Sequence, residues 1–354
     1  MFDPSKELLI EAHRPTWTTF RLWMLFTSML FAAEGLTAWS VWNGHYALAI
    51  VGVVLAAHFM HSQLMAFHEA AHGVLCPPRW LNEAVGIVIG NFHLNGLTLF
   101  RNVHSTHHAF LGTEKDEQLW PFVDTSTPRW LRRGAAISEL CFGMFYDAVL
   151  FWTAFARKSS PIHAAHARWR VRAELCSMIG FWGATIGLTI YLGTWNLLLW
   201  LYVLPALLTG SMYALRKYIE HMGLMGRTPA GLSRSVVHTD PLGKLYTFTM
   251  FNIGYHGVHH AYSAMPQHSL PKFTGVLADE AGETETVYPN YRRAFWDMLP
   301  SLKDPRIGSQ WQSTNGDASQ TPCEPAAVPA PHVRAAKTLD ESCRTIDESA
   351  GTAR

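Results

Sequence analysis

The sequence is poor in charged residues. Asp, Glu, Lys and Arg make up 16% of its 354 residues, well below the quarter that is usual in soluble globular domains. The formal net charge is only +1, which gives no reason to expect nucleic acid or an acidic partner. Aromatic residues reach 12%, and the mean hydropathy is +0.04. This combination predicts a membrane protein with a substantial part outside the bilayer.

The cysteines lack any pairing pattern. They are odd in number and show no C-x-x-C spacing, at Cys76, Cys141, Cys176, Cys323 and Cys343. This excludes a disulfide framework and predicts free thiols in a reducing compartment. The N-terminal segment lacks the basic start and small-residue cleavage site of a secretory signal peptide.

Large apolar residues become rare after about Asp304, where Ser, Thr, Asp, Ala and Pro dominate. Such a composition cannot bury enough surface to fold. We therefore predict one membrane domain over residues 1–304 and a disordered C-terminal tail over residues 305–354. The tail shows no pattern of a fused haem domain.

What the sequence does contain is long apolar runs in pairs. They cover Leu22 to Trp42, Tyr46 to Met65, Leu175 to Leu192 and Trp195 to Leu215. Each run is about long enough to cross 30 Å of hydrocarbon as a helix. The predicted fold is an all-α membrane protein with two transmembrane hairpins, hence four spans. The interrupted segments Ala84 to Leu97 and Gly134 to Phe155 are expected to be interfacial or re-entrant helices.

Basic residues set the expected orientation. The two hairpin turns, at residues 43–45 and 193–194, contain no Lys or Arg, whereas the other ends of the spans carry many. By the positive-inside rule the basic face is cytoplasmic. Both termini and a helical cap are then expected on the cytoplasmic side of an integral membrane protein.

Three histidine clusters follow the spans on that face. The first is His68-Glu-Ala-Ala-His72, and the others repeat one pattern, H-x-x-H-H, at His104 to His108 and at His256 to His260. On a helix, residues i, i+3 and i+4 share one face, so each cluster presents its imidazoles in one direction. His221 lies one turn past the fourth span. A structural role explains a lone histidine well, but not helix-phased groups of this kind.

The first cluster alone matches H-E-x-x-H, the zinc metalloprotease motif. A membrane zinc metalloprotease is therefore one alternative, although a zinc site needs only three or four protein ligands. A zinc or iron transporter is less consistent, because transporters place their ligands near the middle of the membrane. A site for two metals uses all the clusters and leaves open positions for O₂. Imidazole suits iron among other metals, and redox chemistry beside a membrane favours iron.

The three clusters resemble the histidine boxes of the membrane fatty acid desaturase and hydroxylase superfamily, and the resemblance covers roughly residues 20 to 275, including the two hairpins. That resemblance implies a di-iron oxidoreductase that uses O₂ to attack C–H bonds of a fatty acyl chain. It implies no catalytic residues beyond the metal ligands. Carried over onto this sequence, the ligands are His68, His72, His104, His107, His108, His221, His256, His259 and His260.

Within the superfamily the most direct expectation is a fatty acid desaturase. A hydroxylase, a carotenoid ketolase and an alkene-forming fatty acid decarboxylase carry similar boxes and stay open. The H-x-x-x-H spacing of the first box resembles acyl-lipid desaturases and carotenoid ketolases. Electrons are expected from a separate donor such as a ferredoxin, docking on the cytoplasmic face.

Several residues outside the proposed ligand set also have expected roles. Glu34 in the first span is expected within reach of His58, either along a substrate tunnel or as a pair joining two helices. Glu69 and Asn252 are candidates to support the ligands. Lys217 occupies the position where some acyl-CoA desaturases present an Asn, so that contact is not expected. The scattered histidines His93, His163, His166, His238 and His268 are expected to be non-ligands.

Overall fold

The computed structural model describes residues 6–273 and 283–312. Within this part, four helical segments are long and apolar enough to cross a membrane: Glu7–Trp42, Tyr46–His72, Ala165–Tyr191 and Trp195–His221. The prediction of a mostly helical membrane protein with four spans in two hairpins is confirmed.

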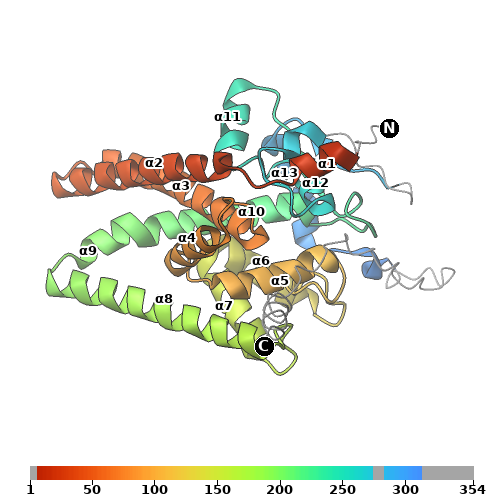
Figure 1. The fold of residues 1–354 in the computed structure, drawn as a ribbon, viewed down its shortest axis with the longest axis horizontal. Helices are drawn as coiled ribbons and strands as arrows, with labels where there is room; N and C mark the ends of the chain where they lie inside the picture. The colour runs from red at the N-terminus through yellow and green to blue at the C-terminus, as the bar shows by residue number, and fades with distance from the viewer. Residues whose placement is uncertain (1–5, 274–282, 313–354) are drawn as a thin grey trace, which may run out of the picture. The chain divides into compact units, whose positions relative to one another are not determined.

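The first hairpin comprises α1 (Lys6–Ala12), α2 (Trp17–Trp42) and α3 (Tyr46–His72). Gly44, with φ of +74°, makes the turn between α2 and α3, and the two helices lie side by side (Figure 1). Gln63 joins them inside the pair, because its Oε1 accepts hydrogen bonds from Trp23 Nε1 at 2.6 Å and Thr27 Oγ1 at 3.3 Å.

The second hairpin begins with α8 (Ala165–Tyr191) and turns at Gly193, which has a φ of +66°. The return segment is α9 (Trp195–Leu198), the π-helical η1 (Leu199–Val203) and α10 (Leu204–His221). α10 packs against α3 (Figure 1). The C-terminal end of α3, at His72, and that of α10, at His221, therefore reach the same region.

Four shorter helices connect the hairpins: α4 (Arg79–Phe92), α5 (Leu97–Ala109), α6 (Arg129–Phe142) and α7 (Met144–Ala156). Gly143, with φ of +39°, separates α6 from α7. Buried side chains of α3, α5 and α7, among them Phe67, Phe100 and Phe151, form one apolar core with residues of α4 and α8.

The chain after α10 is less regular. It contains β1 (Arg234–Val236), α11 (Pro241–Thr249), α12 (His256–Ala261), η2 (Leu270–Phe273), β2 (Thr286–Tyr288), α13 (Tyr291–Met298), η3 (Leu299–Lys303) and η4 (Ser309–Trp311). β1 and β2 pair in parallel, with Ser235 opposite Val287. Ile307 and Trp311, which follow the predicted domain boundary, are buried. The rest of the predicted tail, residues 313–354, lies outside the described residues.

Gly210 of α10 lies where that helix touches the start of α7. A Cβ built on Gly210 would fall well inside van der Waals contact of the Met144 backbone nitrogen, which cannot move aside as a flexible side chain can. We expect Gly210→Ala to lower the free energy of unfolding by about 1–3 kcal/mol, the usual cost of overpacking. Thermal unfolding in detergent measures this. Gly180→Ala is the control, because a Cβ on Gly180 meets nothing within 4 Å; equal midpoints for the two variants would contradict the prediction.

Candidate metal centre

The first histidine pair occupies the last turns of α3. Gly73 ends the helix in the left-handed conformation, with φ of +78°, which glycine adopts without a steric penalty. Arg101 of α5 binds two carbonyls of the last turn, because its Nε donates to Ala71 O at 2.8 Å and its Nη2 to Ala70 O at 3.1 Å. Arg101 is itself held by Glu83. This anchoring fixes the helix end that carries His72.

The second cluster lies on α5, where His104 and His107 are each oriented by a polar side chain from the following loop. His104 Nδ1 lies 2.7 Å from Gln118 Oε1, and His107 Nδ1 lies 2.9 Å from Asp116 Oδ2. Both acceptors lack a proton to give, so each imidazole donates from Nδ1 and keeps a lone pair on Nε2.

The third cluster lies on the short helix α12, beside the end of α10. His221 Nδ1 lies 2.8 Å from the carbonyl oxygen of Leu232, which again leaves its Nε2 unprotonated. Residues on or next to β1 and β2 anchor the first turn of α12. The Gly257 N–H donates to Glu285 Oε1 at 3.0 Å and to Ser235 Oγ at 3.1 Å.

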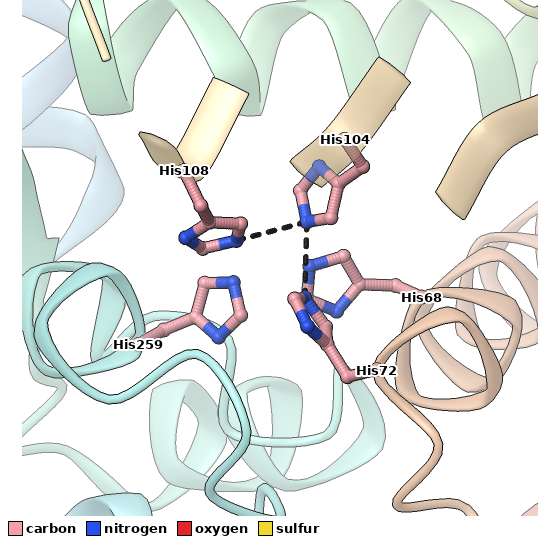
Figure 2. Close-up of side chains that lie close together, drawn as sticks. All are labelled: His68, His72, His104, His108 and His259. Carbon is pink, nitrogen blue, oxygen red and sulfur yellow. Dashed lines mark hydrogen bonds between the residues drawn. The ribbon is translucent and has the colours of Figure 1, made fainter. Parts of the chain in front are cut away.

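The nine predicted side chains come together in overlapping groups of possible ligand atoms that lie within 4.8 Å of one another. The first group holds His68, His72, His104, His108 and His259. The second holds His107, His221 and His260, and a third combines Glu220 with His221 and His256. Figure 2 shows the first group, in which rings from α3, α5 and α12 face a common space.

The nitrogen positions fit metal ions. His104 Nε2 lies 3.1 Å from His72 Nε2 and 3.0 Å from His108 Nε2, as the dashed lines in Figure 2 mark. His256 Nε2 lies 2.8 Å from His221 Nε2 and 3.0 Å from His260 Nε2. Ligands about 2.1 Å from one ion and at right angles lie ~3 Å apart. In each set, three Nε2 atoms approach one another. A single proton can join only two of these nitrogens, whereas one metal cation can bind all three.

Burial keeps these imidazoles in the form that binds metals. Desolvation, followed by the neighbouring histidines, holds the pKa well below the ordinary value of 6.5 for five of the ligand candidates outside the spans: His104, His108, His256, His259 and His260. A neutral imidazole has the free lone pair that coordination requires. The group is therefore prepared for a cation at neutral pH.

Two carboxylates sit against the histidines. Glu69 Oε1 is 3.9 Å from His68 Nδ1, and Glu69 Oε2 accepts a hydrogen bond from the Gln267 N–H at 3.0 Å. Gln267 in turn accepts from Asn252 Nδ2 at 2.9 Å. Glu220, which lies 3.6 Å from His256 Nε2, was not singled out from the sequence as a ligand candidate.

Gln118 and Asp116 were also missed by sequence reasoning. Their only indication is a pair of polar residues, D-x-Q, in the loop after the second box. Such loop residues are common, and nothing in their spacing shows that the loop folds back onto α5.

Other expectations are corrected or clarified by the contacts. No hydrogen bond or ion pair joins Glu34 to His58 among the described residues, and His58 Nε2 instead hydrogen-bonds Thr249 Oγ1 of α11 at 2.9 Å. Lys217 forms an ion pair with Glu139 and lies 3.7 Å from Asp147 Oδ1. His163 is exposed and belongs to none of the three groups.

Comparison with known proteins identifies this arrangement. The family model described as fatty acid desaturase matches residues 44–292, which include all three clusters and His221. No curated protein matches the chain. The match covers most of the sequence, and buried histidine groups lie where the histidine boxes of that family fall. The chain is a membrane oxidoreductase that belongs to the fatty acid desaturase family.

Proposed function

We propose that this protein is a fatty acid desaturase whose nine clustered histidines hold two iron ions. The observation that carries the proposal is the convergence of these histidines into three buried or partly buried groups of possible ligand atoms, of which the second and third share His221. On this assignment His68, His72, His104, His108 and His259 hold one ion. His107, His221, His256 and His260 hold the other, with Glu220 beside it. When bound, the iron pair supplies the activation of O₂.

The residues of the chain supply position and a dry environment. Asp116, Gln118 and the Leu232 carbonyl fix three of the rings in the tautomer that leaves Nε2 free, and such outer partners raise ligand affinity. The first group lies against the apolar core, where the ring of Phe100 stacks on His104 at 5.1 Å between centroids. This apolar wall suits a hydrocarbon chain and excludes water from the reaction.

The stoichiometry requires an external donor. In a desaturation the acyl chain loses two hydrogen atoms, an external donor supplies two electrons, the solvent supplies two protons, and O₂ leaves as two molecules of water. The positive-inside distribution of basic residues supports a cytoplasmic location for the histidine groups and both termini. A soluble donor such as a ferredoxin would then reach the groups from the cytoplasm.

The function is tested by expressing the chain in a bacterium and profiling its lipids and volatile products with and without air. A new double bond in acyl chains that appears only in air is the expected result. Hydroxylated chains, oxidised carotenoids or terminal alkenes would each assign a different reaction of the superfamily. An unchanged profile in air, from protein that retains iron, would refute an acyl substrate. Activity that survives without O₂, with zinc bound, would indicate a protease instead.

Asp116 provides a separate test of the ligand assignment. Asp116→Ala removes the acceptor that orients His107, and we expect iron affinity to fall about 10- to 100-fold, as for other outer partners of ligating histidines. Titration of the metal-free protein with Fe²⁺ measures this. Asp124→Ala in the same loop is the matched control, because the Asp124 side chain hydrogen-bonds residues of its own exposed turn, among them Ser126, and belongs to none of the histidine groups. Unchanged affinity in Asp116→Ala would remove Asp116 from the site.

A further inference from the structure

A cavity of about 30 Å³ lies beside the first histidine group. His68 forms part of its wall, and the wall continues over Phe100 to Asp147 and Phe151 of α7. A cavity of this volume has room for roughly two water-sized groups. Whatever occupies it lies directly against a histidine of the proposed metal site.

Two atoms in the wall of this cavity have hydrogen-bonding capacity that nothing uses. His93 is 1% exposed and Asn95 is 8% exposed, yet His93 Nε2 and Asn95 Oδ1 have no hydrogen-bond partner. Both residues line the cavity. Leaving a buried polar atom unpaired is costly, so these atoms call for a group that is absent from the protein itself.

The chemistry of the two atoms defines that group. His93 Nδ1 lies 3.0 Å from Met144 Sδ, and a thioether sulfur is only a weak acceptor. Nδ1 therefore carries the proton, and Nε2 offers a lone pair. Burial lowers the pKa of His93 to about 3, in agreement with a neutral ring. The amide oxygen of Asn95 is likewise an acceptor. A group that binds in the cavity must therefore donate a hydrogen bond to satisfy either atom.

The charges of the residues around the cavity limit which chemical group can bind there. None of the described residues lining the cavity is Lys or Arg, and Asp147 contributes a carboxyl group. The nearby cation Lys217 is engaged by Glu139 and lies 3.7 Å from Asp147 Oδ1. An anionic carboxylate would face lone pairs on several sides, and a methyl end would leave both acceptors unpaired. A hydroxyl group satisfies an acceptor without bringing charge.

We propose that this cavity binds a hydroxyl group of the substrate, which donates its one proton to His93 Nε2 or Asn95 Oδ1 while a water molecule donates to the other, so that the preferred substrate is a long-chain alcohol or hydroxylated acyl chain. The inference rests on the proposed function for the chemistry that follows binding. Because the cavity adjoins His68, the C–H bonds that react lie within a few bonds of that hydroxyl.

The test measures binding to the metal-free protein in detergent, and so its outcome is independent of iron, O₂ and the electron donor. Labelled dodecan-1-ol is the probe, with dodecane, methyl dodecanoate and dodecanoate at pH 8 as competitors. Sites built to bind a hydroxyl discriminate strongly against analogues that lack it. We expect the alcohol to bind at least about tenfold more tightly than each of the other three.

Variants of His93 and Asn95 test whether these two residues cause the preference for the alcohol. Asn95→Leu and His93→Phe should each reduce it and together abolish it, whereas His93→Gln, which keeps an acceptor, should retain more of it than His93→Phe. Asn91→Leu is the matched control on the neighbouring helix, because Asn91 Nδ2 binds Ser177 Oγ and does not line the cavity. Thermal unfolding of each variant separates loss of binding from loss of folding.

Equal binding of alcohol and hydrocarbon, unaffected by Asn95→Leu, would overturn the inference and assign water alone to the cavity. Dodecanoate binding as tightly as the alcohol would also overturn it, since the acceptors would then not select against an anion. Failure here would leave the family function intact, because the lipid profile tests that function separately. Conversely, binding that depends on the hydroxyl group, together with no product in air, would support the hydroxyl-binding site and refute the proposed desaturase activity.

Discussion

Replacing His107 with alanine is expected to abolish product formation and to remove one of the two proposed iron ions. His107 belongs to the second group with His221 and His260, and its ring is held by Asp116. The five histidines of the first group are untouched, so the other ion should remain. Metal analysis of the purified protein gives the iron content, and lipid profiling gives the activity.

The matched control for His107→Ala is His163→Ala. His163 is exposed, and we expect its replacement to change neither iron content nor activity. Equal losses in the two variants would refute the assignment of His107 as a ligand. Complete loss of both ions in His107→Ala would show that the two groups bind cooperatively as one site.

The largest effect on stability is expected from Arg216. Its Nη1 donates to both carboxylate oxygens of Glu220, at 2.6 and 2.8 Å, and their side chains are only 7% and 3% exposed. Arg216→Met leaves the Glu220 carboxylate buried without its partner. Breaking a buried ion pair in this way costs about 3–5 kcal/mol, which thermal or denaturant unfolding of the metal-free protein would measure.

A double variant isolates the cause. Arg216→Met combined with Glu220→Leu removes both charges, and we expect it to recover much of the lost stability, because paired charges can often be replaced by apolar groups at little cost. Arg170→Met is the surface control: Arg170 binds Glu83 but is 44% exposed, so its loss should cost at most about 1 kcal/mol. A single variant Arg216→Met that unfolds like Arg170→Met would contradict the prediction.

The sequence predicted the spans and the histidine clusters well, for a physical reason. A span needs about 20 apolar residues whatever its neighbours are, and residues such as His104 and His108 share a helix face through local geometry alone. Both properties depend only on the residues of one continuous segment of the chain. The positions of the four spans follow from the first property, and the shared helix face within each box follows from the second.

The contacts that the sequence did not predict join distant segments. Nothing near Glu220 shows that it will lie beside His256, and nothing near Asp116 shows which way its loop folds. His58 was expected to meet Glu34 from hairpin pairing, but α11 offers it Thr249 instead. Such contacts depend on how separate helices pack, which local periodicity does not encode.

The exchange of ligand candidates between boxes has a consequence for how the protein is made. His259, near the C-terminal end of the matched region, completes the first group, whereas His107 of the second box completes the other. The hydrogen bond from Gln267 to Glu69 likewise joins positions 198 residues apart. During synthesis the first hairpin and α5 therefore emerge long before either histidine group can be completed. Such long-range contacts form slowly, so binding of the proposed iron ions is expected only after α12 has been made.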